Sequence, residues 1–191
     1  MISATIFGSG NMGGAIGELL SVAGASVQHV GESENATIEG DVVILAVPYE
    51  ALSDIVKRYG NQLHGRVVVD ITNPVDFETF DALKVPAGSS AAAELQAALP
   101  DARVVKAFNT TFADTLSSKQ VGPNATTVLV AGDDDGAKEK LIDAVRACGL
   151  AAVDAGPLAR AHELEGLGFL QLTLANDEKI SWSAGFGLVT G

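Results

Sequence analysis

The first residues of the chain combine an apolar run, a group of glycines and an amphipathic segment, and this order restricts the fold most. The run at 2–7 predicts a buried strand, and apolar residues at steps of three and four over 12–23 predict a helix. Between them lies a G-x-G-x-x-G motif, Gly8-Ser9-Gly10-Asn11-Met12-Gly13. Its glycines permit a tight turn, close approach of a ligand and close helix packing. The junction therefore predicts a turn whose free N–H groups bind a pyrophosphate, with a turn that binds nothing as the alternative.

The rest of the chain alternates apolar runs with segments of helical periodicity. We expect strands at 26–30, 42–47, 67–69, 103–108, 126–131 and 151–153. We expect helices at 51–59, 90–99, 138–147 and 157–175, and a loop at 31–40. This alternation predicts an α/β protein: a Rossmann-type, doubly wound, mainly parallel sheet with helices on both faces. We expect one NAD(P)-binding Rossmann domain over 1–191, extended by a C-terminal helix and apolar tail at 157–191.

The carboxyl ends of the predicted strands carry small and amide residues. In doubly wound sheets, ligands bind beyond these ends, where the strand order reverses. Besides the glycine turn, the ends in question are Ala46-Val47-Pro48, Thr72-Asn73-Pro74 and Asn109-Thr110-Thr111. Each alone is as typical of an ordinary turn, because Pro and Asn are common turn residues. Together with a glycine turn at the same edge, they favour a slot for a nicotinamide ring.

Composition excludes several classes of partner. The net charge of −12 would repel a nucleic-acid backbone or an anionic membrane surface. No apolar run approaches the ~20 residues of a membrane span, and no signal peptide is recognisable, so we expect a cytoplasmic protein. The single cysteine, Cys148, lies in an apolar helical pattern and is expected in the core.

The sequence offers no clear catalytic residue. The 3 histidines are scattered, so we expect no metal site. Asp133, Asp134 and Asp135 precede a helix and are expected to cap it. Asp70 is a candidate for a structural role, and Lys106 is a candidate for a charge partner. Because carbonyl or imine reduction needs a placed proton donor, the lack of one mildly favours hydride exchange between two cofactors.

Several motifs in consistent order resemble the coenzyme F420-dependent NADP oxidoreductase family. They are the glycine turn, Ala46-Val47-Pro48, Asp70-Ile71-Thr72-Asn73-Pro74, Val105-Lys106-Ala107-Phe108-Asn109-Thr110, Gly132-Asp133-Asp134-Asp135 and Asp154-Ala155-Gly156-Pro157-Leu158. The run 161–165 is similar to a helix in the cytosolic reductase domain of six-transmembrane metalloreductases. The resemblance covers nearly the whole chain.

The resemblance implies NADP(H) along the strand ends and hydride exchange with a flavin, deazaflavin or other small organic acceptor. It implies pyrophosphate contacts from Gly8, Ser9, Gly10, Asn11, Met12 and Gly13. It implies a nicotinamide beside Val47, Pro48, Asn73 and Asn109, and the adjoining strand-end residues Ala46 and Pro74 are further candidate cofactor contacts.

The segment after the second predicted strand departs from the family. It is shorter, and it carries Gly31-Glu32-Ser33 where the family has a basic signature such as Gly-Ser-Arg. An acid at Glu32 suits the ribose hydroxyls of NAD, and it would disfavour the 2′-phosphate of NADP. No Lys or Arg precedes Lys57, so no neighbour in sequence supplies a cation. Ser33, Asn35 and backbone N–H groups could instead hold the phosphate, which leaves NADP(H) and NAD(H) both open.

Two other functions remain as alternatives. A non-catalytic NAD(P)-binding redox sensor would share the glycine turn but need no acceptor pocket. The opening Gly-Ser-Gly-Asn-Met-Gly also resembles pyrroline-5-carboxylate reductase, whose added dimerisation domain has no room in this chain. The apolar tail over 180–188 is expected to be an added strand, a lid or a dimer contact, so a homodimer is a further expectation.

Overall fold

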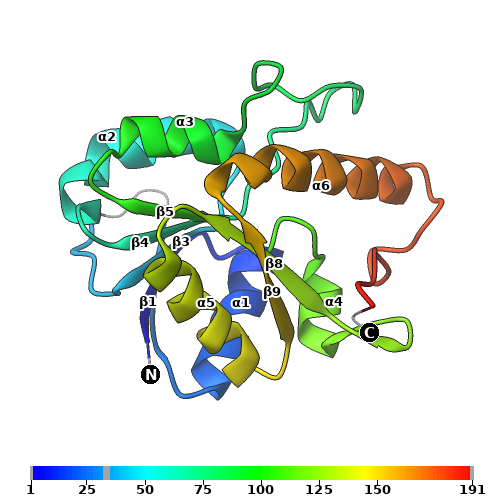
Figure 1. Cartoon of the computed structure of the whole chain (residues 1–191), viewed down its shortest axis with the longest axis horizontal. Coiled ribbons are helices and arrows are strands. Elements are labelled where there is room, and N and C mark those ends of the chain that lie inside the picture. Colours follow the sequence, from blue (N-terminus) through cyan, green and yellow to red (C-terminus); the bar gives the residue numbers. More distant parts are fainter. Residues whose placement is uncertain (1, 32–34, 190–191) are drawn as a thin grey trace.

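A computed structural model describes residues 2–31 and 35–189. Its main sheet has seven strands in the order β2-β1-β3-β4-β5-β8-β9 (Figure 1). The strands are β1 (Ser3–Phe7), β2 (Ser26–Val30), β3 (Val42–Leu45), β4 (Val67–Asp70), β5 (Arg103–Lys106), β8 (Thr127–Gly132) and β9 (Ala151–Gly156). β2 and β3 flank β1 on opposite sides, so the strand order reverses beside β1, where the glycine turn begins. The expected α/β Rossmann-type sheet is confirmed.

Helices cover both faces of this sheet, as the alternating pattern predicts (Figure 1). The helices are α1 (Asn11–Val22), α2 (Leu52–Leu63), α3 (Ala91–Ala98), α4 (Ala113–Ser118), α5 (Asp135–Ala147) and α6 (Ala161–Asn176). Short 3₁₀ turns, η1 (Tyr49–Ala51) and η2 (Leu158–Arg160), precede α2 and α6. One apolar core lies under α1, α4 and α5, and a second lies under α2 and α3. Because the central strands are buried on both faces, they read as unbroken apolar runs.

Three features differ from the sequence-based prediction. β8 runs antiparallel to β5, so the sheet is mixed at this point. The helix α4 and a small hairpin of β6 (Gln120–Val121) and β7 (Asn124–Ala125) were not predicted, because each is too short to show periodicity. The apolar tail adds no strand; after α6 the chain turns back toward α4 (Figure 1).

Two local predictions agree with the structure: the cap at the start of α5 and the burial of Cys148. Asp134 caps α5, accepting a hydrogen bond from Ala137 N at 2.7 Å. Cys148 is buried in the core, and burial raises the pKa of its thiol. Within the described ranges, no group of His, Cys, Asp and Glu side chains is arranged to hold a metal ion. In the same part of the chain, no helix has the length and hydropathy that a bilayer crossing requires.

Candidate functional site

The turn between β1 and α1 brings backbone unusually close to backbone. Gly8 has φ +96°, and a Cβ there would lie 2.2 Å from Ala46 O. A Cβ on Gly13 would lie 2.3 Å from Gly8 O. Glycine is therefore required at both positions, the first by conformation and contact and the second by contact. These contacts hold the start of α1 against the ends of β1 and β3.

The middle glycine of the turn faces open space. A Cβ on Gly10 would meet nothing within 4 Å. Gly10 is also the N-cap of α1, and no side chain caps this end of the helix. The first N–H groups of α1 are thus available to a ligand, and the helix dipole favours an anion there. An uncapped helix start beneath an open glycine fits a pyrophosphate.

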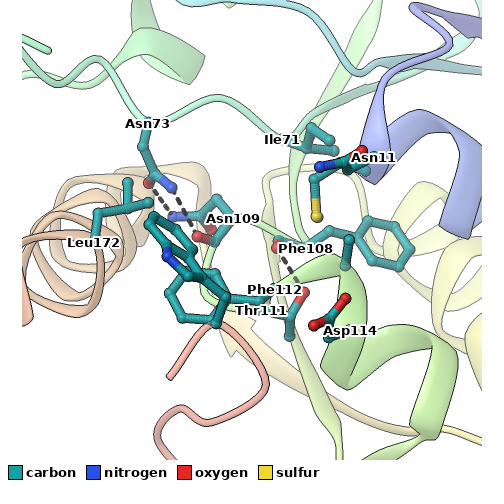
Figure 2. Close-up of a pocket in the computed structure, with 12 residues that line it drawn as sticks. Asn11, Ile71, Asn73, Phe108, Asn109, Thr111, Phe112, Asp114 and Leu172 are labelled. Carbon is teal, nitrogen blue, oxygen red and sulfur yellow. Dashed lines mark hydrogen bonds between the residues drawn. The ribbon is translucent and has the colours of Figure 1, made fainter. Parts of the chain in front are cut away.

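A cavity of about 360 Å³ lies beside this turn, at the carboxyl ends of β4 and β5 (Figure 2). Asn11 and Met12 line it from the start of α1. The other lining residues come from the loops after β4 and β5, from α4, from α6 and from the tail: Ile71, Asn73, Phe108, Asn109, Thr111, Phe112, Ala113, Asp114, Leu172 and Trp182. Among the described lining residues, Asp114 is the only one with an ionisable side chain.

Two asparagines are joined at one side of the cavity (Figure 2). Asn73 Nδ2 donates to Asn109 O at 2.8 Å, and Asn109 Nδ2 donates to Asn73 Oδ1 at 2.9 Å and to Leu164 O of α6 at 2.8 Å. Gly168 lets α6 approach the pair, since a Cβ there would lie 2.3 Å from Asn73 Oδ1. Asn109 Oδ1 is buried and has no hydrogen-bond partner in the described structure. A buried acceptor without a partner is costly, so this oxygen is suited to a ligand N–H.

Phe108 lines the cavity in a strained backbone conformation. Its φ is +62°, a left-handed value that is uncommon for a bulky side chain. The turn is held by Thr111, whose backbone N–H and hydroxyl both donate to Phe108 O, at 3.1 Å and 2.8 Å. Strained residues of this kind concentrate at functional sites. This strained turn places Phe108 and Asn109 just beyond the carboxyl end of β5.

A buried ion cluster lies beneath the asparagine pair. Lys106 Nζ is 2.8 Å from Asp70 Oδ2 and 2.7 Å from Glu165 Oε1, and all of these side chains are fully buried. The same ammonium donates to Thr72 O at 2.5 Å, so its three protons are all used. Glu165 also accepts from Ala91 N at 3.0 Å, at the start of α3. This cluster ties β4, β5, α3 and α6 together below the cavity.

The family model for coenzyme F420-dependent NADP oxidoreductases matches residues 25–74. The F420-dependent NADP reductase of Methanocaldococcus jannaschii is 33% identical over 155 residues, covering 78% of this chain and 69% of that protein. The chain belongs to the F420-dependent NADP oxidoreductase family. The prediction of a nicotinamide-dependent oxidoreductase is thereby confirmed at the level of the family.

A second curated relative and a solved structure are also similar to this chain. The metalloreductase STEAP3 of Rattus norvegicus is 33% identical over 144 residues, which cover 74% of this chain but only 28% of that protein. A crystal structure from Arthrobacter sp. FB24, provisionally named an F420-dependent NADP reductase, superposes with a TM-score of 0.86 at 20% identity, over 100% of both chains. The second similarity supports the fold alone.

The structure brings together only some of the residues expected at the site. Asn11, Met12, Asn73 and Asn109 line the cavity. Gly8, Gly13 and Ala46 contact one another beside it, and Ser9 and Gly10 lie exposed on the turn. The remaining strand-end residues do not line the cavity: Val47 is half-buried, Pro48 is exposed before η1, and Pro74 is buried in the loop after β4. Glu32 and Ser33 lie outside the described residues.

Sequence reasoning missed the aromatic wall of the cavity. Phe112 belongs to the unpredicted start of α4, and Trp182 belongs to a tail with no periodicity. The positive φ of Phe108 leaves no signal in the sequence. Lys106, a candidate charge partner near the expected slot, does not line the cavity and instead pairs with the buried Asp70 and Glu165.

No neighbour in sequence supplies a cation to the segment after β2, but a helix that is distant in sequence brings one close to it. Arg58, on α2, places Nη2 3.5 Å from Asn35 Oδ1. Its guanidinium carbon also lies 5.3 Å from the centroid of the Tyr59 ring, which is buried in the core. The cation comes from a helix that follows β3, so sequence proximity could not reveal it.

Glu165 should make stability depend on pH. Burial raises the pKa of its carboxyl, although Lys106 opposes this. The folded state therefore holds this proton more tightly than the unfolded state, and the stability that Glu165 contributes falls as pH rises above about 4.5. Relative to wild type, Glu165→Gln should become progressively more stable above that pH, measured by urea denaturation at a series of pH values. A difference that does not change with pH would contradict this.

Proposed function

We propose that this chain is an NADP(H)-dependent oxidoreductase that transfers hydride between the nicotinamide and a flavin- or deazaflavin-like ring. The observation that carries this proposal is the position of the cavity. It lies directly beside an open, uncapped helix start that suits a pyrophosphate, and Asn11 and Met12 belong to both. A dinucleotide held at the turn would thus present its nicotinamide end toward the cavity.

Different residues along the edge of the sheet would bind different parts of the dinucleotide. The turn over 8–13 would bind the pyrophosphate through backbone N–H groups, with Gly10 giving it room. Asn73 and Asn109 would fix the nicotinamide, with Asn109 Oδ1 available to accept an N–H. Ala46, which lies against Gly8 and Gly13, would border the pyrophosphate turn, whereas Val47 and Pro48 lie outside the cavity lining. The similarity to the F420-dependent NADP reductase of Methanocaldococcus jannaschii supports NADP(H) and a deazaflavin as the pair of substrates.

The side chains that line the cavity are suited to orienting bound rings and are less suited to acid–base catalysis. A reduced nicotinamide held by Asn73 and Asn109 would supply a hydride to the acceptor ring, and water would supply the proton that completes the reduction of that ring. Such a reaction leaves the protein to hold the rings and exclude solvent. Asn, Thr, Phe and Leu side chains suit that task, whereas a carbonyl or imine acceptor would need a placed proton donor.

Parallel calorimetric titrations with NADPH and NADH test the first half of this proposal. Turnover is then followed by the loss of reduced-nicotinamide absorbance with riboflavin, FMN and F420 as acceptors. We expect NADPH to bind and at least one ring to oxidise it. Tight binding of NADPH without its oxidation by any acceptor would contradict the proposal that the protein is an enzyme and would favour a redox sensor. Binding of NADH but not NADPH would contradict the choice of nucleotide.

Arg58 is the residue that we expect to distinguish the two nucleotides. An arginine near the end of the second strand of a Rossmann fold accommodates the 2′-phosphate of NADP. Arg58→Gln should weaken NADPH binding by about tenfold, since a charge-assisted hydrogen bond contributes roughly 1.5–3 kcal/mol. NADH affinity should stay within about twofold, because NADH has no phosphate at this place. Calorimetry at one fixed salt concentration measures both.

Lys57→Gln is the matched control, because Lys57 neighbours Arg58 on α2 but pairs with Asp54 at 3.0 Å. It should alter neither affinity. If Arg58→Gln weakens the binding of NADPH and of NADH equally, Arg58 does not bind the 2′-phosphate.

A further inference from the structure

The segment after α6 folds back over the cavity and is anchored there. Gln171, which is buried on α6, accepts a hydrogen bond from Phe186 N at 3.1 Å. Before this point the chain makes a turn, with Ala184 N donating to Ser181 O at 3.0 Å. These bonds hold residues 181–186 in a defined place at the end of the sheet.

Within that segment, Trp182 forms part of the cavity wall. Its ring centroid lies 4.9 Å from that of Phe112, with a tilt of 54° between the planes. Trp182 is nevertheless 51% exposed, so Phe112 covers only part of the indole. The other apolar side chains of the wall are Met12, Ile71, Phe108, Ala113 and Leu172. An indole that is anchored on one side and open on the other offers a surface for stacking.

The chemistry of the cavity restricts what would stack there. Apart from Asp114, its described polar lining is neutral: Asn11, Asn73, Asn109 and Thr111. These groups do not supply a cation for a carboxylate substrate or a buried acid for a carbonyl. Aromatic surface with amide hydrogen-bonding groups suits a flat heterocycle that carries its own N–H and C=O groups.

We propose that Trp182 is a specificity-determining residue that stacks on the flat ring of a flavin- or deazaflavin-class hydride acceptor bound in this cavity. This inference rests on the proposed function, because it assigns the acceptor side of the same site. It makes the tail part of the acceptor site, while the glycine turn would hold the pyrophosphate and the asparagine pair would hold the nicotinamide. Trp182 would therefore affect binding of the acceptor and not of NADPH.

The chain has a single tryptophan, so its tryptophan fluorescence reports Trp182 alone. Riboflavin, FMN and F420 are each titrated into the protein, with free N-acetyltryptophanamide correcting for light absorbed by the ligands. We expect saturable quenching by the ring that supports turnover. Trp182→Ala should raise the KM for that acceptor by about tenfold, leave the Kd for NADPH unchanged, and be largely rescued by Trp182→Phe.

Phe186→Ala is the control, since Phe186 lies on the same anchored segment but does not line the cavity. It should leave the acceptor KM unchanged. If Trp182→Ala weakens NADPH binding instead, or leaves the acceptor KM unchanged while NADPH is still oxidised, the stacking proposal is wrong and the proposed function stands. If wild type does not bind NADPH at all, the proposed function itself fails.

Discussion

Replacing Lys106 with methionine is expected to lower the free energy of unfolding by about 3–5 kcal/mol, the cost of leaving buried charge unpaired. Lys106 is the one cation between Asp70 and Glu165 in this buried cluster, and it contacts both within 2.8 Å. Its loss would leave two buried carboxylates facing each other across an apolar side chain. A loss of this size is a large share of the roughly 5–15 kcal/mol that stabilises a typical domain. Urea denaturation followed by circular dichroism measures it.

Lys57→Met provides the matched control for this substitution. Lys57 and its partner Asp54 are both more than 70% exposed, at 72% and 73%. Exposed pairs contribute about 0–1 kcal/mol, so this variant should denature close to wild type. If Lys106→Met prevents folding, the triple variant Lys106→Met, Asp70→Asn, Glu165→Gln should recover much of the stability, because it removes the unpaired charges. A loss below about 1 kcal/mol for Lys106→Met alone would show that the cluster does not hold the site.

Gly10→Leu is expected to weaken NADPH binding roughly 100-fold, because its side chain would occupy the space through which the pyrophosphate reaches the backbone. The fold should tolerate the change, since a Cβ at Gly10 meets nothing within 4 Å. Its backbone, with φ −69°, also suits any residue. Stability should fall by no more than about 1 kcal/mol, the usual cost of a poorer N-cap. Calorimetry with NADPH and thermal unfolding separate the two effects.

Substitutions at two neighbouring glycines serve as controls for this experiment. Gly14→Ala also adds a methyl group in open space, but on the exposed side of α1, and it should preserve NADPH affinity and slightly raise stability. Gly13→Ala should lose both stability and affinity, because its Cβ would lie 2.3 Å from Gly8 O. If Gly10→Leu binds NADPH as well as wild type, the pyrophosphate does not lie on this turn.

The local pattern of residues was sufficient to predict most of the framework. β2 was predicted at 26–30 and is Ser26–Val30, because strand periodicity and its flanking glycine and polar residues are local features. The close approach of α1 to β1 also followed from Gly8 and Gly13, whose spacing has meaning only at such a junction, whereas the approach to Ala46 after β3 did not. Family membership followed from motifs in a fixed order.

Other features depend on residues that are distant in sequence, and only the tertiary structure decided them. The amide pair joins Asn73 to Asn109, and the ion cluster joins Lys106 to Asp70 and Glu165. No periodicity encodes such contacts, because they exist only after strands and helices have assembled. The antiparallel direction of β8 was likewise invisible, since a single strand has the same alternation in either direction.

The sequence by itself therefore determined the glycine turn and the α/β architecture, and it predicts the edge of the sheet at which we propose that a nucleotide binds. The tertiary structure decided which residues share one cavity, that Arg58 accompanies the segment after β2, and that Trp182 closes over Phe112. The physical reason is the range of the interactions. Backbone conformation and amphipathic periodicity are set by neighbours along the chain, whereas a binding site is set by packing between elements that the chain brings together only when folded.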